Sequence, residues 1–173
     1  AEIVHDRFHI MANLNSAIDE VRRSEWRSAK AEGKKVIKGS RYLLMMNREN
    51  LDESGQDRLI EITRLNEKLS TAYVLKEDFR AIYTHSPSVR SARARIRRWH
   101  DAVLASGIEP MIRFAKGVMR DIKEVTAYFK HRVTSGRIEA FNNQIARLIH
   151  RACGMTNLEH LFLKMRAQSL KQI

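Results

Sequence analysis

Apolar residues recur every three or four positions along most of this chain, and that spacing constrains the fold more than any other feature. Near the amino terminus the series is Phe8, Met11, Leu14, Ile18 and Val21. Residues spaced in this way form a stripe on one face of an α-helix. Only two prolines and seven glycines interrupt the 173 residues. The sequence therefore predicts a mostly α fold.

Short breaks divide the chain into about seven predicted helices. Gly33 is expected to end the first helix, and residues 33–38 are expected to form a lysine-rich loop. At Ser86-Pro87-Ser88 one predicted helix ends and the next begins. Residues 41–46 are expected to form a short apolar turn of helix, and the remaining helices are expected at residues 56–65, 67–83, 89–107, 110–129, 138–154 and from 156 onward.

Ala1 to Val4 has the composition of the end of a β-strand that stops at Asp6. A strand this short is not stable without neighbouring strands. We therefore expect the chain to be part of a larger protein.

The chain carries a large excess of positive charge. Its 32 Lys and Arg residues exceed its 20 Asp and Glu residues, which gives a formal charge of +12. An excess of this size favours a polyanionic partner, most commonly nucleic acid, although a basic surface can also serve solubility alone. No apolar run is long enough to span a membrane. The single cysteine, Cys153, is compatible with a reducing cytosol and is interpreted as a core residue.

Asp6 stands where the predicted strand gives way to a helix, in the run His5-Asp6-Arg7-Phe8-His9. A carboxylate at the end of a strand is well placed to hold a metal ion, and aspartate is also a good helix N-cap. The residues alone leave both interpretations open. A zinc site using His5, Asp6 and His9 is a weaker alternative, because no further ligand completes a tetrahedral set.

Glu139 opens the helix that follows Thr134-Ser135-Gly136. An acidic residue in a first turn complements the helix dipole, so this position also has a structural interpretation. Arg147 and Arg151 follow four residues apart, so they share one helix face that can contact a nucleic-acid backbone.

Two other features are compatible with nucleic-acid binding. Trp26 follows charged residues and can stack on an unpaired base, whereas Trp99 lies on an apolar stripe and is expected in the core. One helix is rich in arginine and either tracks phosphates or forms a solvated face. Its arginines are Arg90, Arg93, Arg95, Arg97 and Arg98.

The order and spacing of several motifs resemble the insertion-sequence transposases of the ISL-three family. The motifs are residues 4–9, Gly136-Arg137-Ile138-Glu139-Ala140-Phe141-Asn142-Asn143 and Arg151-Ala152-Cys153-Gly154, with further similarity at residues 38–44 and Leu75-Lys76-Glu77. The sequence departs from the family at Cys153 and Met155, where aromatic residues are usual. Both replacements are apolar and can fill similar space.

The resemblance implies a ribonuclease-H-like core with a D, D, E triad and a helical insertion between the second Asp and the Glu. By motif, Asp6 matches the second catalytic Asp and Glu139 matches the catalytic Glu. The first Asp is expected upstream, so this chain alone should be catalytically silent. Such enzymes cleave and transfer DNA strands with two divalent ions about 3.5–4 Å apart. We expect Mg²⁺ or Mn²⁺ at Asp6 and Glu139, because hard ions prefer oxygen ligands.

The resemblance also implies a domain organisation and partners. Residues 1–23 would contain the core strand and following helix, 24–133 the helical insertion, and 134–173 the C-terminal helices of the core. DNA, as element ends and target, is the expected partner, in the bacterial cytoplasm at the nucleoid and without membrane association. The residues expected to contact DNA are Arg137, Asn142, Asn143, Arg147 and Arg151.

Two other classes of protein also fit the sequence. One is a non-catalytic, basic helical DNA-binding module in which Asp6 and Glu139 are only caps. The other is an assembly domain whose charge provides solubility.

The apolar stripes that follow Asp6 and Glu139 also predict how this piece of chain behaves. Without most of the core sheet, they must be covered by the insertion helices or in a homo-oligomer. Of these we favour a dimer.

Overall fold

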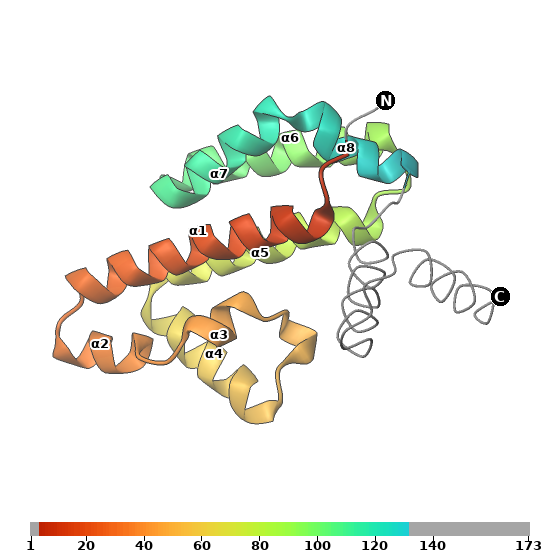
Figure 1. Ribbon diagram of the computed structural model, residues 1–173. Coiled ribbons are helices and arrows are strands. Elements are labelled where there is room, and N and C mark those ends of the chain that lie inside the picture. The colour runs from red at the N-terminus through yellow and green to blue at the C-terminus, as the bar shows by residue number, and fades with distance from the viewer. Residues whose placement is uncertain (1–3, 132–173) are drawn as a thin grey trace, which may run out of the picture. The chain divides into compact units, whose positions relative to one another are not determined.

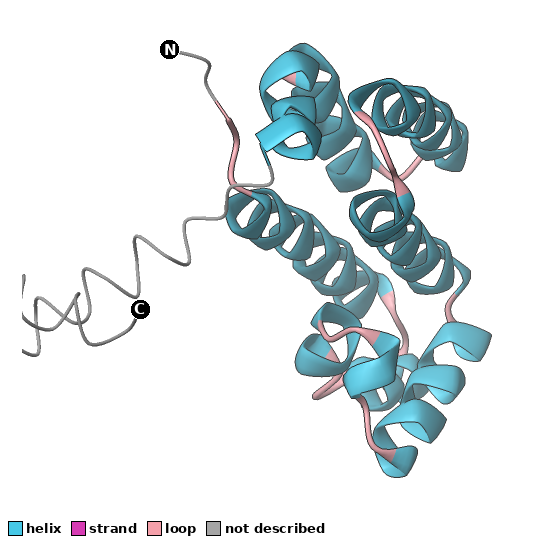
Figure 2. Ribbon diagram, turned by 90° about the vertical axis from the view of Figure 1, so that its right-hand side faces the viewer, coloured by secondary structure: helices cyan, strands magenta, loops and turns pink. Residues whose placement is uncertain are grey.

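The computed structural model describes residues 4–131, and every regular element in that range is helical, which confirms the mostly α prediction (Figures 1 and 2). Val4 has no regular secondary structure, and the rest of the expected strand lies outside the described residues. The elements are α1 (Arg7–Ser28), α2 (Ala31–Ile37), α3 (Arg41–Met45), the 3-10 turn η1 (Arg48–Asn50), α4 (Glu53–Leu65), α5 (Glu67–His85), α6 (Val89–Ser106), α7 (Glu109–Arg120) and α8 (Ile122–His131).

The long helices pack side by side. α1 lies along α5 and α7, and α6 packs on α5, α7 and α8 (Figure 1). The short helices α2, α3 and α4 gather beside this bundle and contact α1 or α5. No helix within residues 4–131 combines the length and the apolar character that crossing a bilayer requires.

The predicted apolar stripes meet in one core. Leu14 and Ile18 of α1, Phe79 of α5 and Ile96 of α6 are almost fully buried. The Phe79 ring lies 4.5 Å from the Trp99 ring, centroid to centroid. The Trp99 indole Nε1 donates a hydrogen bond to the buried Leu75 carbonyl at 2.8 Å, which satisfies its polar atom. The core position expected for Trp99 is confirmed.

Helix ends follow local side-chain chemistry. Asp52, Asn66 and Ser88 accept hydrogen bonds from the first turns of α4, α5 and α6. Gly107 ends α6 with φ at 65°, a left-handed conformation that glycine adopts without steric cost. The breaks predicted at residues 86–88 and at Gly107 are therefore confirmed.

The prediction that Gly33 ends the first helix was wrong, and so was the predicted loop at residues 33–38. α1 ends at Ser28, and Gly33 lies inside α2. Ala31, Glu32 and the lysines are good helix formers, and Ile37 anchors the short helix in the core. A Cβ at Gly33 would lie 3.1 Å from the Ala29 Cβ, so glycine here permits close packing.

The single helix predicted for residues 110–129 is in fact two helices, α7 and α8, which meet at Asp121. The Asp121 N–H donates to the Gly117 carbonyl, and the Val125 N–H donates to the Asp121 carbonyl. Hydrogen bonds of the helical type therefore continue through the turn. The apolar spacing continues as well, so the sequence pattern does not show the break.

The stripe of α1 is covered inside the described part of the molecule. Leu14, Ile18 and Val21 are buried. Phe8 was predicted to lie on the same stripe but is 65% exposed and lies outside the core. Helices α5 and α7 therefore cover this stripe. The stripe after Glu139 lies outside the described residues, and the oligomeric state stays a prediction.

Candidate functional site

Asp6 occupies the corner where an extended segment enters α1. Its side-chain Oδ1 accepts a hydrogen bond from the Phe8 N–H at 3.1 Å, so the N-cap interpretation of this residue is realised. The His5 N–H donates to the Glu124 carbonyl of α8 at 3.1 Å. These two bonds fix the direction in which the chain enters α1 and hold the Asp6 carboxylate in a defined place.

Aromatic residues support this corner from below. The Arg7 guanidinium lies 5.4 Å from the centre of the Tyr83 ring, and Tyr83 stacks on Phe129 at 5.3 Å. Burial raises the pKa of the Tyr83 hydroxyl, an effect that the nearby Arg7 charge opposes. Tyr83 therefore stays neutral at physiological pH and packs against Arg7, the residue that follows Asp6.

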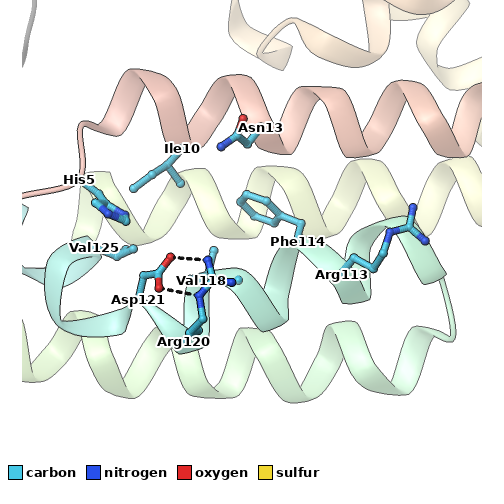
Figure 3. Close-up of a pocket in the computed structure, with 10 residues that line it drawn as sticks. His5, Ile10, Asn13, Arg113, Phe114, Val118, Arg120, Asp121 and Val125 are labelled. Atoms are coloured by element: carbon cyan, nitrogen blue, oxygen red, sulfur yellow. Dashed lines mark hydrogen bonds and ion pairs between the residues drawn. The ribbon is translucent and has the colours of Figure 1, made fainter.

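A pocket of about 270 Å³ opens beside the corner, between α1 and α7 (Figure 3). Ile10, Phe114 and Val118 form its apolar wall. The two arginines at its edge are already engaged: Arg120 pairs with Asp121 at 2.8 Å and Arg113 with Glu20 at 2.5 Å. With both cations neutralised, the pocket offers little attraction to a free anion.

The predicted metal ligands do not gather around Asp6 in the described part of the chain. Within residues 4–131, no three His, Cys, Asp or Glu side chains come together in a way that could hold a metal ion. His5, Asp6 and His9 thus form no three-ligand zinc site. Glu139, the second predicted ligand, lies outside the described residues. So do the predicted DNA contacts Arg137, Asn142, Asn143, Arg147 and Arg151.

The arginine-rich helix predicted to track phosphates is α6. Arg90, Arg97 and Arg98 are exposed and form no ion pair with any residue between 4 and 131. Arg93 has a structural role, because its Nε donates to the Thr126 hydroxyl of α8 at 3.1 Å. Arg95 is half-buried in an open groove between α5 and α6. The helix therefore presents three fully available cations, fewer than the five predicted.

Lys76 is a buried charged residue whose role the sequence interpretation missed. Its Nζ donates to the carbonyls of Leu44 at 3.0 Å and Met46 at 2.6 Å, at the end of α3. The Glu77 carboxylate lies 3.1 Å away, and Arg80 pairs with Glu77 at 2.9 Å. Lys76 occupies a stripe position of α5, four residues after Ala72, and that spacing was the available signal.

Comparisons with known proteins add to this geometry. A family model described as a transposase, DDE_Tnp_ISL3, matches residues 1–165. A transposase for insertion sequence element IS1001 of Bordetella parapertussis is 32% identical over 170 residues, which cover 96% of this chain and 42% of that protein. A transposase for insertion sequence element IS1557 of Mycobacterium tuberculosis is 26% identical over 179 residues, with coverages of 90% and 40%. The chain thus spans about two fifths of the length of these relatives. No solved structure matches it.

Proposed function

The chain belongs to the DDE_Tnp_ISL3 family of transposases, and from this membership we propose that it is part of the catalytic region of a DDE-type enzyme. The complete enzyme would cleave DNA strands at insertion-sequence ends and transfer them to a target. The observation that carries the proposal is the extent of the family match, which includes both Asp6 and Glu139. The proteins that carry IS1001 and IS1557 in their names are transposases of insertion sequences, which agrees with this activity.

Asp6 and Glu139 would hold divalent ions such as Mg²⁺ or Mn²⁺, two in the complete site. Carboxylate oxygens are the ligands that these ions prefer. When bound, the ions supply charge stabilisation for the attacking and leaving oxygens of phosphodiester chemistry. The corner at Asp6 suits such a role, because the bonds to Phe8 and Glu124 orient the carboxylate before any ion arrives.

The other predicted residues would position DNA. Arg137, Asn142, Asn143, Arg147 and Arg151 follow the motif around Glu139, and side chains of these types contact phosphates and sugars. The first catalytic Asp would come from outside this chain, so the chain by itself would bind DNA without cleaving it. The active assembly would be a homo-oligomer, which sedimentation of the full-length enzyme at several concentrations would test.

The decisive experiment separates a metal ligand from a helix cap. In the full-length enzyme, Asp6→Asn preserves an N-cap hydrogen bond but removes the negative charge. We expect strand cleavage to be lost while DNA affinity and the melting temperature stay near those of the wild type. Asp52→Asn is the matched control, because Asp52 caps α4 through a 2.9 Å bond to the Gly55 N–H. That variant should cleave normally.

The competing function is a non-catalytic DNA-binding module. The hydrogen bond between Asp6 and Phe8 favours this competing function, because capping α1 is by itself a sufficient structural role for Asp6. If Asp6→Asn cleaves at the wild-type rate, Asp6 is only a cap and the competing function gains. Glu139→Gln supplies an independent test of the second ligand.

A further inference from the structure

The lysine-rich segment after α1 forms an ordered stripe on the surface. Lys30, Lys34 and Lys38 follow one another at intervals of four residues, so they lie along one face of α2 and its two ends. Lys30 and Lys38 are exposed, and Lys34 is half-buried. The Lys34 ammonium lies 5.1 Å from the centre of the Trp26 ring of α1. We call Lys30, Lys34 and Lys38 the lysine stripe.

No carboxylate among the described residues neutralises the lysine stripe. Two acids of the neighbouring helix α1 are engaged elsewhere: Asp19 pairs with Arg22 at 2.8 Å, and Glu25 pairs with Lys68 at 3.2 Å. Glu25 also accepts a hydrogen bond from the Asn66 amide at 3.0 Å. Glu32 is the remaining acid of α2 and forms no ion pair with the described residues. The stripe and its neighbours Arg27 and Lys35 therefore carry more positive charge than Glu32 offsets.

The helix that carries the stripe is firmly seated. Ile37 is 2% exposed and anchors α2 in the core. Arg58 of α4 donates from Nη2 to the carbonyls of Lys35 at 3.2 Å and Val36 at 3.0 Å. Gly33 allows α2 to lie close against Ala29. The backbone positions of the three lysines are thus held in a row, so the backbone needs little ordering when a partner binds.

We propose that the lysine stripe binds the phosphate backbone of duplex DNA, outside the catalytic site. The seven residues of α2 lie between Lys30 and Lys38, so eight residue steps separate the two lysines, a rise of about 12 Å. One DNA strand presents a phosphate about every 3.4 Å along its axis, so a fixed row of this length spans several phosphates. Lysine offers a point charge without base-edge geometry, so this contact is independent of sequence.

The position of the stripe sets where on the DNA it acts, and this step rests on the proposed function of Asp6. α1 has 22 residues and separates Asp6 from the stripe by about 33 Å. At about 3.4 Å per base pair, DNA that reaches both places extends at least about ten base pairs beyond the cleaved bond. The stripe therefore holds flanking duplex about one helical turn away.

The test compares two triple variants of this chain with equal loss of charge. The first is Lys30→Gln, Lys34→Gln and Lys38→Gln. The control neutralises three exposed cations without ion pairs on other helices, namely Arg64→Gln, Lys116→Gln and Lys123→Gln. Affinity for a random-sequence duplex is measured between about 50 and 200 mM salt. We expect the first variant to lose affinity at least tenfold, with a salt slope smaller by about two to three.

The control should change affinity less than about threefold, and circular dichroism should show both variants folded. An equal loss in the two variants, or an unchanged salt slope in the first, would overturn the inference. A stripe that binds an acidic polypeptide as tightly as duplex DNA would also overturn it.

The flanking position is tested in the full-length enzyme by phosphate-modification interference. Interference that the stripe variant removes should lie at least about ten base pairs from the cleaved bond. Interference confined to the immediate cleavage site would contradict the flanking position. A failure of the proposed function would be seen in a different measurement. It predicts that Asp6→Asn loses cleavage, and it requires no change in DNA affinity.

Discussion

Lys76 and Lys34 both place an ammonium group over an aromatic ring, yet their surroundings are opposite. The Lys76 Nζ lies 4.3 Å from the centre of the Tyr73 ring, inside the protein, where two backbone carbonyls and Glu77 surround it. The Lys34 Nζ lies 5.1 Å from the centre of the Trp26 ring, which is 43% exposed. No described carboxylate pairs with Lys34.

The difference shows that position on the helix decides what a lysine does. Lys76 lies on the buried stripe of α5, so its ammonium bonds the carbonyls at the end of α3 and thereby joins α3 to α5. Lys34 is half-buried against Trp26 but has no carboxylate partner among the described residues, so its charge remains available to a partner. Removing the first should damage the fold, and removing the second should damage only binding.

The largest effect is expected at Lys76. Lys76→Ala removes the donor for the Leu44 and Met46 carbonyls and leaves a cavity, so unfolding free energy should fall by about 3–5 kcal/mol. Urea unfolding followed by circular dichroism measures this. Lys76→Met keeps most of the side-chain volume and should lose less, about 1–3 kcal/mol, because no cavity forms and the loss is limited to the two carbonyl bonds and the ion pair with Glu77. Equal losses in the two variants would mean that the lost ammonium contacts account for the whole effect and the side-chain volume for none, whereas no loss in Lys76→Met would mean that the ammonium contributes nothing.

A smaller effect is expected at Arg58, which holds the end of α2 as Lys76 holds the end of α3. Arg58→Ala removes the hydrogen bonds to the Lys35 and Val36 carbonyls and should cost about 1–2 kcal/mol. Amide hydrogen exchange should rise in α2 more than in α5. If exchange in α2 is unchanged, Arg58 does not seat the lysine stripe. Arg64→Ala, an exposed change in the same helix, is the control.

The sequence predicted the long helices well because their cores need one continuous apolar face. It located the stops at residues 86–88 and at Gly107, where local chemistry decides the end of a helix. It missed α2 because the role of Gly33 depends on Ala29, a contact that local propensity does not show. It missed the turn at Asp121 because hydrogen bonds and apolar spacing continue through the turn.

The candidate site was less accessible from the sequence. Motif order singled out Asp6, and the structure adds its cap bond to Phe8 and the bond of the preceding residue, His5, to α8. The pairing of Asp6 with Glu139 is a prediction that concerns a residue outside the described part of the chain. Lys76 stood within a motif that resembled the family, but only the fold shows that it reaches the α3 carbonyls.

The environment of Lys76 also predicts a dependence on alkaline pH. Burial, assisted by the charge of Glu77, raises the pKa of Tyr73 from 10.0 to about 12. In the unfolded chain Tyr73 therefore loses its proton first, so its contribution to stability is complete below pH 10 and is lost as the pH rises to about 12. Burial lowers the pKa of Lys76, and the effect on stability is opposite to that of Tyr73. The contribution of Lys76 to the free energy of unfolding grows as the pH rises toward 10.5.

Unfolding free energies measured from pH 9 to 11.5 should show the Tyr73 effect. Tyr73→Phe should reduce the alkaline loss by up to about 1.4 kcal/mol per pH unit, the slope that corresponds to one proton. Tyr42 is 72% exposed, so Tyr42→Phe is a control that should leave the slope unchanged. A wild-type slope in Tyr73→Phe would show that another group controls alkaline unfolding.

The smallest effect on stability is expected where the effect on binding is expected to be large. The lysine stripe forms no ion pair with described residues, and only Lys34 has a ring beneath it, so neutralising Lys30, Lys34 and Lys38 removes little that holds the fold together. Glutamine is a helix former comparable to lysine, so α2 should persist. Unfolding free energy should change by about 0.5 kcal/mol or less, as is usual for surface substitutions.

A loss as large as that of Lys76→Ala would show that the stripe supports the fold, and the contrast between the two lysines would then disappear. A small gain is also consistent with the contrast, because three like charges within eight residues repel one another and neutralising them relieves that repulsion.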